Sequence, residues 1–334
     1  GFYASIVDKQ QIRSRPDTLR IMALGELGST ENNTGTNHNP GLQSPVWRFD
    51  QFNRIALIQD SGISLTYREL HQYGQKIAEK IPGRCLVFSL CSNSAGSIAG
   101  YTGFLNNRIV PLLLNSNMDM SLLEALIDTY LPAFIWAPQS MSGLLPGRAV
   151  FSALDYALIQ TGFEKSYPLN PELGLLLTTS GSTGSPKLVR QSYRNIQSNT
   201  QAIAQYLELN ETERPITTLP MNYTYGLSII NSHLYCGAAL LLTSVPVFDR
   251  RFWDFFNKHQ GTSFGGVPFT YEMLDKTGFF RLKLPTLRTM TQAGGKLPVE
   301  LQKRFVAWAN NNGVRFVVMY GATEATARMT YLPP

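Results

Sequence analysis

The stretch TTSGSTGSPKLVRQS, residues 178–192, directly follows the apolar run LGLLL at residues 173–177. Small hydroxyl side chains, two glycines, one proline and one lysine occupy most of its positions. Glycine and serine let successive backbone N–H groups turn toward one point, so such a loop can surround phosphate oxygens with lysine as a countercharge. The same composition also occurs in plain flexible turns, and the loop alone leaves both interpretations open.

A Walker A loop is excluded at this position. That motif has the form G-x-x-x-x-G-K-[ST] and leads straight into a helix. Lys187 instead follows Pro186 and precedes Leu188.

Outward from this loop, short apolar runs alternate with amphipathic stretches along the chain. Such alternation is typical of β-α-β units with parallel strands. The sequence therefore predicts an α/β protein with doubly wound sheets. A further helix is expected after Thr66, with Glu69 completing a capping box. Strands are predicted at 54–60, 84–90, 109–114, 132–137, 173–179, 216–220, 238–243, 262–266, 287–292 and 314–320, and helices at 94–106, 119–131, 193–207, 226–236, 249–259, 268–275 and 298–312.

Three loops rich in glycine and threonine follow predicted strands. They are TTSGSTGSPK from residue 178, QAGGKLP at 292–298 and YGATEAT at 320–326. In doubly wound sheets ligands bind outside the carboxyl ends of the strands, so these three loops are the candidate site.

Composition excludes several other classes of protein. The 334 residues are 43% hydrophobic and carry a net charge of +6, without a run of like charges that would indicate a nucleic-acid arm. The longest apolar runs are too short to span a bilayer. The three cysteines have no C-x-x-C spacing, and with no leader visible we expect reduced thiols and a cytoplasmic location.

Loop and motifs together resemble the adenylate-forming superfamily of acyl-CoA synthetases, luciferases and peptide-synthetase adenylation domains. TSGSTGSPK at 179–187 is similar to the phosphate-binding signature of that family, and YGATEAT to its Y-G-x-T-E signature. SLTYREL at 64–70, residues 103–117, LPMNYTYGLS at 219–228 and QAGGKLP agree in order and spacing. The resemblance covers about residues 47–334. It departs at Leu188, where the family usually has glycine.

The resemblance implies a ligase that binds ATP and Mg²⁺ and joins a small carboxylic acid to the α-phosphate, releasing pyrophosphate. A carboxylate is already a nucleophile, so the protein has to position two anions and neutralise developing charge. The implied catalytic residues are Lys187, Thr323 and Glu324, with Glu324 also as the Mg²⁺ ligand. The implied nucleotide-binding residues are Thr179, Ser180, Gly181, Ser182, Thr183, Gly184, Gly294, Gly295, Tyr320 and Gly321, and the substrate pocket is expected at Tyr223, Tyr225, Gly265 and Gly266.

Two features of the sequence limit which carboxylic acid the resemblance implies as substrate. Many members of the family have histidine where Tyr223 stands, and members that take α-amino acids have an aspartate near this turn. No aspartate lies between Leu219 and Ser228. An α-amino acid is therefore disfavoured, and the aromatic residues of FGGVPFTYEML at 264–274 favour an aryl or fatty acid, although core packing would explain them too. Coenzyme A or a carrier-protein thiol is the expected acceptor, and no nucleic-acid partner or membrane span is expected.

The resemblance also predicts the domain organisation, with two doubly wound, mostly parallel β-sheets sandwiched with helices. Residues 1–46 are expected to form an irregular segment and 47–334 an AMP-binding lobe, with one subdomain at about 80–210 and another at about 47–79 plus 211–334. The C-terminal lobe of the family, which carries a further lysine, is expected to be missing, so the isolated chain should have weak or no activity. A non-catalytic nucleotide- or acyl-binding module is the alternative.

Overall fold

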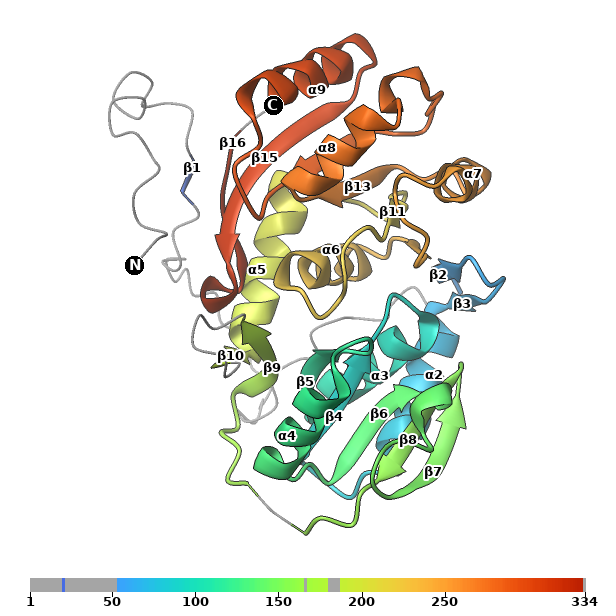
Figure 1. Cartoon of the computed structure of the whole chain (residues 1–334), viewed down its shortest axis with the longest axis vertical. Coiled ribbons are helices and arrows are strands. Elements are labelled where there is room, and N and C mark those ends of the chain that lie inside the picture. Colours follow the sequence, from blue (N-terminus) through green and yellow to red (C-terminus); the bar gives the residue numbers. More distant parts are fainter. Residues whose placement is uncertain (1–19, 22–52, 165–166, 180–186, 333–334) are drawn as a thin grey trace, which may run out of the picture.

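The computed structural model describes residues 20–21, 53–164, 167–179 and 187–332. Two mixed sheets lie one above the other, with helices between them and helices on their outer faces (Figure 1). This confirms the predicted α/β fold with two doubly wound, mostly parallel sheets.

The seven-stranded sheet is parallel at its centre, where β5, β4, β6 and β9 run in the same direction. β10 joins one edge antiparallel to β9, and the β7–β8 hairpin joins the other edge antiparallel to β6. The spatial order is β10 (Lys187–Ser192), β9 (Leu173–Thr179), β5 (Val110–Asn115), β4 (Leu86–Cys91), β6 (Phe134–Pro138), β8 (Tyr156–Gln160) and β7 (Arg148–Ala153).

The nine-stranded sheet is parallel from β2 through β12, β11, β13 and β14 to β15, and antiparallel at both edges. The spatial order is β1 (Arg20–Ile21), β16 (Ala327–Leu332), β15 (Arg315–Ala322), β14 (Thr289–Gln292), β13 (Ser263–Gly266), β11 (Pro215–Ile216), β12 (Leu240–Leu242), β2 (Ile55–Gln59) and β3 (Ser64–Thr66).

Helices fill three layers around these sheets. α2, α3 and α6 share one buried cluster with strands of both sheets, so they form the middle layer. α4 packs on the outer face of the seven-stranded sheet, and α7, α8 and α9 on the outer face of the nine-stranded sheet. The helices are α2 (Tyr67–Ala78), α3 (Ala95–Asn106), α4 (Met120–Tyr130), α5 (Tyr193–Tyr206), α6 (Thr224–Tyr235), α7 (Arg250–Lys258), α8 (Pro268–Lys276) and α9 (Val299–Asn311), with short 3₁₀ turns η1 (Gln139–Met141), η2 (Phe279–Arg281) and η3 (Thr323–Ala325).

Local sequence signals set several helix starts. The backbone N–H of Glu69 donates to Thr66 Oγ1 at 3.2 Å, while the N–H of Thr66 donates to Glu69 Oε2 at 2.8 Å. This reciprocal pair is the capping box that the sequence predicts, and it satisfies two donors that the helix leaves free. Asp249 caps α7 by accepting from the N–H of Arg251 at 2.9 Å.

The strand predicted at 216–220 is shorter than expected. β11 ends at Ile216, because the next two threonine side chains bond to neighbouring strands through their hydroxyls. Thr217 Oγ1 donates to Thr243 O at 3.2 Å, and Thr218 Oγ1 donates to Gly265 O. Side-chain bonds of this kind compete with the strand ladder.

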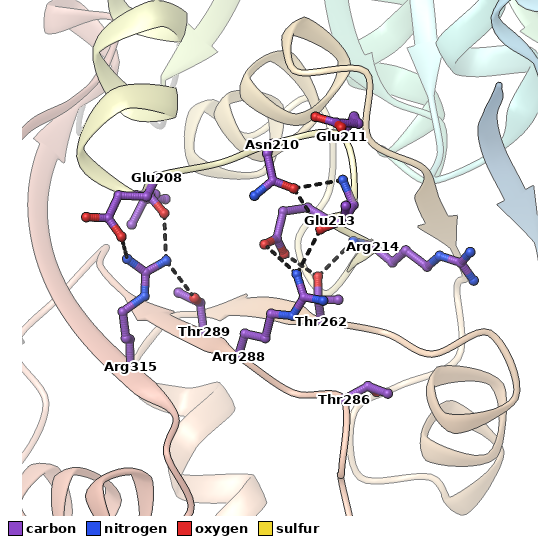
Figure 2. A network of polar contacts seen from close by, with 12 residues as sticks. Glu208, Asn210, Glu211, Glu213, Arg214, Thr262, Thr286, Arg288, Thr289 and Arg315 are labelled. Atoms are coloured by element: carbon purple, nitrogen blue, oxygen red, sulfur yellow. Dashed lines mark hydrogen bonds and ion pairs between the residues drawn. The ribbon is translucent and has the colours of Figure 1, made fainter.

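Charged side chains hold the amino ends of the nine-stranded sheet (Figure 2). The guanidinium of Arg315 donates to Glu208 Oε2 at 3.1 Å and to Thr289 Oγ1 at 3.2 Å. The carboxylate of Glu213, only 5% exposed, accepts from Thr262 and pairs with Arg288 at 3.4 Å. This end of the sheet is therefore closed by polar contacts, and the loops after β14 and β15 lie at the opposite, carboxyl end of its strands.

Candidate functional site

The first candidate loop connects two antiparallel strands. Thr179 ends β9 and pairs with Lys187, which begins β10 with an exposed side chain. The two ends of the loop therefore lie side by side. The predicted phosphate-binding residues Ser180, Gly181, Ser182, Thr183 and Gly184 lie outside the described residues.

A tight turn follows β15 and carries the Y-G-x-T-E residues. Tyr320 is 65% exposed, so a face of its ring is available for stacking. A Cβ added at Gly321 would lie 1.6 Å from Ala327 O, so only glycine allows β16 to fold back this closely. Thr326 and Ala327 have φ values of +58° and +87°. Such values are unfavourable for residues other than glycine, and strain of this kind clusters at functional sites.

Thr323 joins this turn to two other segments. Its hydroxyl accepts from Thr224 Oγ1 at 2.8 Å, and its carbonyl accepts from Gln191 Nε2 at 3.2 Å. Thr224 is the first residue of α6, and Gln191 belongs to β10. The turn containing η3, coloured red, lies beside β10 in Figure 1.

The amino end of α6 also faces this place. Tyr223 is the N-cap residue of α6, and its side chain makes no capping hydrogen bond to the helix. The first N–H groups of a helix carry a partial positive charge that stabilises anions. The amino end of α6, which begins at Thr224, is therefore a favourable place for a phosphate group and lies next to Thr323.

Gly294 lies against the same aromatic turn. Its φ is +80°, and a Cβ there would lie 2.7 Å from Tyr223 Oη and 2.9 Å from Val267 Cγ1. Gly295 also has a close neighbour, since its Cβ would lie 3.1 Å from Pro268 Cγ. These contacts bring the QAGGKLP and LPMNYTYGLS motifs together. Burial raises the pKa of Tyr223, so its hydroxyl is neutral at ordinary pH.

Of the predicted substrate-pocket residues, Gly265 lines a small cavity. Tyr225 Oη lies 2.7 Å from Thr291 Oγ1, and a Cβ at Gly265 would lie 2.9 Å from that same Tyr225 oxygen. The cavity beside Gly265 measures about 10 Å³, which is room for about one water molecule. Gly266 packs against Tyr271 and Thr270.

Arg328 is a residue of this region that the motifs do not single out. It is 3% exposed, lies 5.1 Å from the Tyr225 ring centre and donates to Ser228 Oγ at 2.9 Å. Among the described residues no carboxylate lies within 4.0 Å of it. Buried charges are usually paired, and this one carries an uncompensated positive charge into the predicted pocket. The sequence alone offers no signal, since burial of an arginine is a tertiary property.

Metal-binding capacity rests on few side chains. Glu324 is exposed on η3, and in the described part of the chain no three His, Cys, Asp or Glu residues are grouped to hold a metal ion. A site with one carboxylate suits Mg²⁺ when substrate phosphates and water supply the other oxygens. The described helices include none long and apolar enough to cross a membrane.

Comparison with known proteins identifies the family. The model of the AMP-binding enzyme family matches residues 142–334, more than half of the chain. The chain belongs to the AMP-binding enzyme family. This membership confirms the resemblance to adenylate-forming enzymes that the motifs indicate.

Individual relatives agree with this assignment. The chain is 28% identical over 165 residues to the long-chain-fatty-acid–CoA ligase of Bacillus subtilis, covering 47% of the chain and 29% of that ligase. It is 24% identical over 305 residues to the feruloyl-CoA synthase of an Amycolatopsis species, covering 86% and 60% respectively. The matches thus span less than two thirds of these relatives.

Solved structures support the fold. The o-succinylbenzoate CoA synthetase of Bacillus subtilis, in complex with its acyl-adenylate intermediate, superposes with a TM-score of 0.69 at 20% identity. The superposition covers 87% of this chain and 61% of that one. At this identity the likeness concerns the fold alone.

Proposed function

We propose that the chain binds Mg²⁺-ATP and activates a carboxylic acid as its adenylate for transfer to a thiol. The observation that carries the proposal is the convergence on Thr323. Hydrogen bonds from Thr224 and Gln191 bring the Y-G-x-T-E turn, the aromatic turn and the carboxyl end of β10 to one place.

Each group has a proposed role. Lys187 neutralises the terminal phosphates, Glu324 holds Mg²⁺, and Thr323 with the amino end of α6 contacts the α-phosphate. Tyr320 stacks on adenine, and Gly294 and Gly295 allow close approach of the backbone on its other side. These residues position two anions and offset the charge that develops as the acid oxygen attacks phosphorus.

Arg328 bears on the kind of acid. A guanidinium 5.1 Å from the Tyr225 ring would repel the ammonium of an α-amino acid in this low-dielectric interior. The aromatic turn between Leu219 and Ser228 contains no acidic residue that would attract it. We therefore propose an acid without an ammonium group, aryl or fatty in character. Coenzyme A or a carrier-protein thiol is the proposed acceptor.

Titration calorimetry with Mg²⁺-ATP tests the nucleotide site directly. We expect Lys187→Ala and Glu324→Ala each to weaken binding by about tenfold or more, the loss of one charge-assisted contact. Lys296→Ala is the matched control, because this exposed lysine follows Gly295 and has no proposed contact with phosphate. Absence of ATP binding by the parent chain would contradict the proposal.

Carboxylate-dependent exchange of pyrophosphate into ATP separates an enzyme from a binding module. Exchange that requires an added acid and is lost in Lys187→Ala supports adenylation. Even weak exchange of this kind would exclude the non-catalytic module, because a binding module exchanges no pyrophosphate with any acid in a panel of aryl, fatty and amino acids.

A further inference from the structure

The buried guanidinium of Arg328 lies among apolar side chains. It contacts Tyr225 and Met319, both members of one buried apolar cluster, and it lines a small cavity together with Leu207 and Ile229 of the same cluster. No carboxylate in the described part of the chain lies within 4.0 Å of it. An unpaired charge in such surroundings is costly, so an anion that reaches this guanidinium gains a desolvated partner.

One edge of this guanidinium is left unused by the protein. Nε donates to Ser228 Oγ at 2.9 Å, and Nη1 donates to Tyr206 Oη at 3.3 Å and lies 3.5 Å from Met319 Sδ. These partners are all neutral. Nη2 donates to no residue that the structure describes. Guanidinium groups bind carboxylates through strong paired N–H···O bonds, so the free N–H groups of Nη2 suit an anionic oxygen.

Two more polar atoms without partners belong to residues of the same cavity. Ser263 Oγ and His233 Nε2 are buried, and neither has a hydrogen-bond partner among the described residues. Both side chains line the cavity of about 10 Å³ that Arg328 also lines. The Ser263 hydroxyl can donate to an anion, and Nε2 can accept from a water molecule beside it. Buried polar atoms are normally satisfied, so these atoms indicate a place that a polar group of a ligand would complete.

This cavity adjoins the proposed substrate pocket. Gly265 lines it, and the ring centre of Tyr225 lies 5.1 Å from the guanidinium. From Gly265 the cavity extends toward Ser263 and Thr289, at the amino ends of β13 and β14. The phosphates of the nucleotide are proposed to bind at the opposite, carboxyl ends of these strands. The charge of Arg328 therefore lies at the inner end of the pocket, away from the reacting carboxylate.

Helix α6 sets the distance between the two ends of the pocket. Thr224 bonds to Thr323, where the α-phosphate is proposed to bind, and Ser228 bonds to Arg328. The two residues are four positions apart on one face of α6, which is about one turn or roughly 5.4 Å along the helix. Because consecutive Cα atoms, three bonds apart, are about 3.8 Å apart, an extended chain of four bonds spans about 5 Å. A short acid can therefore reach from one end to the other.

From this geometry we infer that Arg328 is a specificity-determining residue that binds a second carboxylate at the far end of the acid. This role rests on the proposed adenylation, and it narrows the acid to a short chain with a carboxylate at each end. One carboxylate attacks phosphorus, and the other pairs with Nη2 of Arg328 and takes no part in the bonds that form and break. A monocarboxylic acid would place carbon against the guanidinium and leave its charge unpaired.

Three probes of nearly equal length test the second carboxylate. At about pH 7.5 glutarate carries two carboxylates, glutaric acid monoamide replaces one by a neutral amide, and pentanoate replaces it by a methyl group. The nucleotide site is filled with Mg²⁺ and an ATP analogue that has a methylene bridge between the α- and β-phosphates, so no adenylate forms. By calorimetry we expect glutarate to bind about tenfold more tightly than the other two. Equal affinity for glutarate and its monoamide, or no glutarate binding at about 10 mM, would overturn the inference.

Substitution of Arg328 locates the preference. Arg328→Met removes the charge but keeps a long side chain, and it should weaken glutarate binding by about tenfold or more without weakening pentanoate binding. Arg328→Lys should keep part of the preference for glutarate. Arg250→Met is the matched control, because the Arg250 side chain is 91% exposed, and it should leave all three affinities unchanged. Equal weakening of all three probes in a folded Arg328→Met protein would show a purely structural role and refute the inference. If that variant does not fold, the three probes on the parent protein decide alone.

Failure of this inference can be distinguished from failure of the proposed function. Absence of Mg²⁺-ATP binding contradicts adenylation itself, whatever the acids do. Nucleotide binding together with stronger pyrophosphate exchange for pentanoate than for glutarate would leave adenylation in place and refute the role of Arg328.

Discussion

His233 shows how burial fixes the charge of one side chain. Its Nδ1 lies 2.8 Å from the carbonyl oxygen of Ile229, which can only accept, so Nδ1 carries the proton. Nε2 is then an acceptor, and it is buried without a partner among the described residues. Burial, reinforced by the charge of Arg328, lowers the pKa of His233 to about 4. The folded protein therefore holds this ring neutral.

Acid should consequently destabilise the fold. Between pH 6.5 and 4 the unfolded chain binds a proton at this histidine that the folded chain resists. We expect the free energy of unfolding to fall by as much as about 3 kcal/mol over that window from this group. Denaturant unfolding at several pH values measures it. His233→Gln should reduce the slope, and the more exposed His259→Gln should change it less; equal slopes in parent and His233→Gln would contradict the prediction.

Residue identity alone can predict only part of the site. The glycines and the Y-G-x-T-E residues can be found because their spacing is a local signal. Gln191 and Thr224, which bind Thr323, escape sequence reasoning, since a single glutamine or threonine has no distinctive pattern. Their role exists only after β10, α6 and η3 meet.

The crossing of α2 and α3 depends on two glycines. A Cβ at Gly103 would lie 2.6 Å from Gly74 Cα, so the helices touch backbone to backbone. Gly103→Ala should cost about 1–3 kcal/mol of unfolding free energy, because the overpacking exceeds the gain in helix propensity. Gly143→Ala is the matched control, with no atom within 4 Å of its new Cβ. Thermal unfolding compares them, and equal melting temperatures would contradict the close crossing.

The loop from α5 to β11 is anchored by Glu213. Replacing this buried carboxylate by alanine leaves the Thr262 hydroxyl and the Arg288 guanidinium without their acceptor. We expect Glu213→Ala to lower the free energy of unfolding by about 1–3 kcal/mol. Glu208→Ala removes a partner of Arg315 whose side chain is 80% exposed, and should cost less than about 1 kcal/mol. Similar losses in both variants on urea unfolding would refute the distinction.

The strands differ in how clearly the sequence predicts them. Parallel strands such as β4 and β5 are apolar on both faces and therefore stand out as continuous hydrophobic runs. β7, β10 and β16 are absent from the predicted strands because they are partly exposed, antiparallel strands with mixed residues. Their positions depend on pairing with β8, β9 and β15, which no local pattern encodes.

The middle layer of helices makes the two sheets interdependent. Phe104 of α3 is fully buried in a cluster that includes Val87 of β4 and Leu240 of β12, one from each sheet. Phe305 of α9 is equally buried, but its cluster belongs to the nine-stranded sheet and its outer helices. Replacing each of these two phenylalanines by alanine therefore tests whether the two sheets unfold as one unit.

Phe104→Ala should lower the free energy of unfolding by about 3–5 kcal/mol through loss of burial and the cavity it leaves. Because α3 contacts β4 of one sheet and β2 of the other, native-state hydrogen exchange should accelerate in β4 and β2 alike. Phe305→Ala, the same change in an outer layer, should accelerate exchange first in β13 to β15 and spare β4 to β6. If Phe104→Ala affected the seven-stranded sheet alone, the sheets would be separate units of stability, and the middle layer would act as a contact between two bodies and not as a shared core.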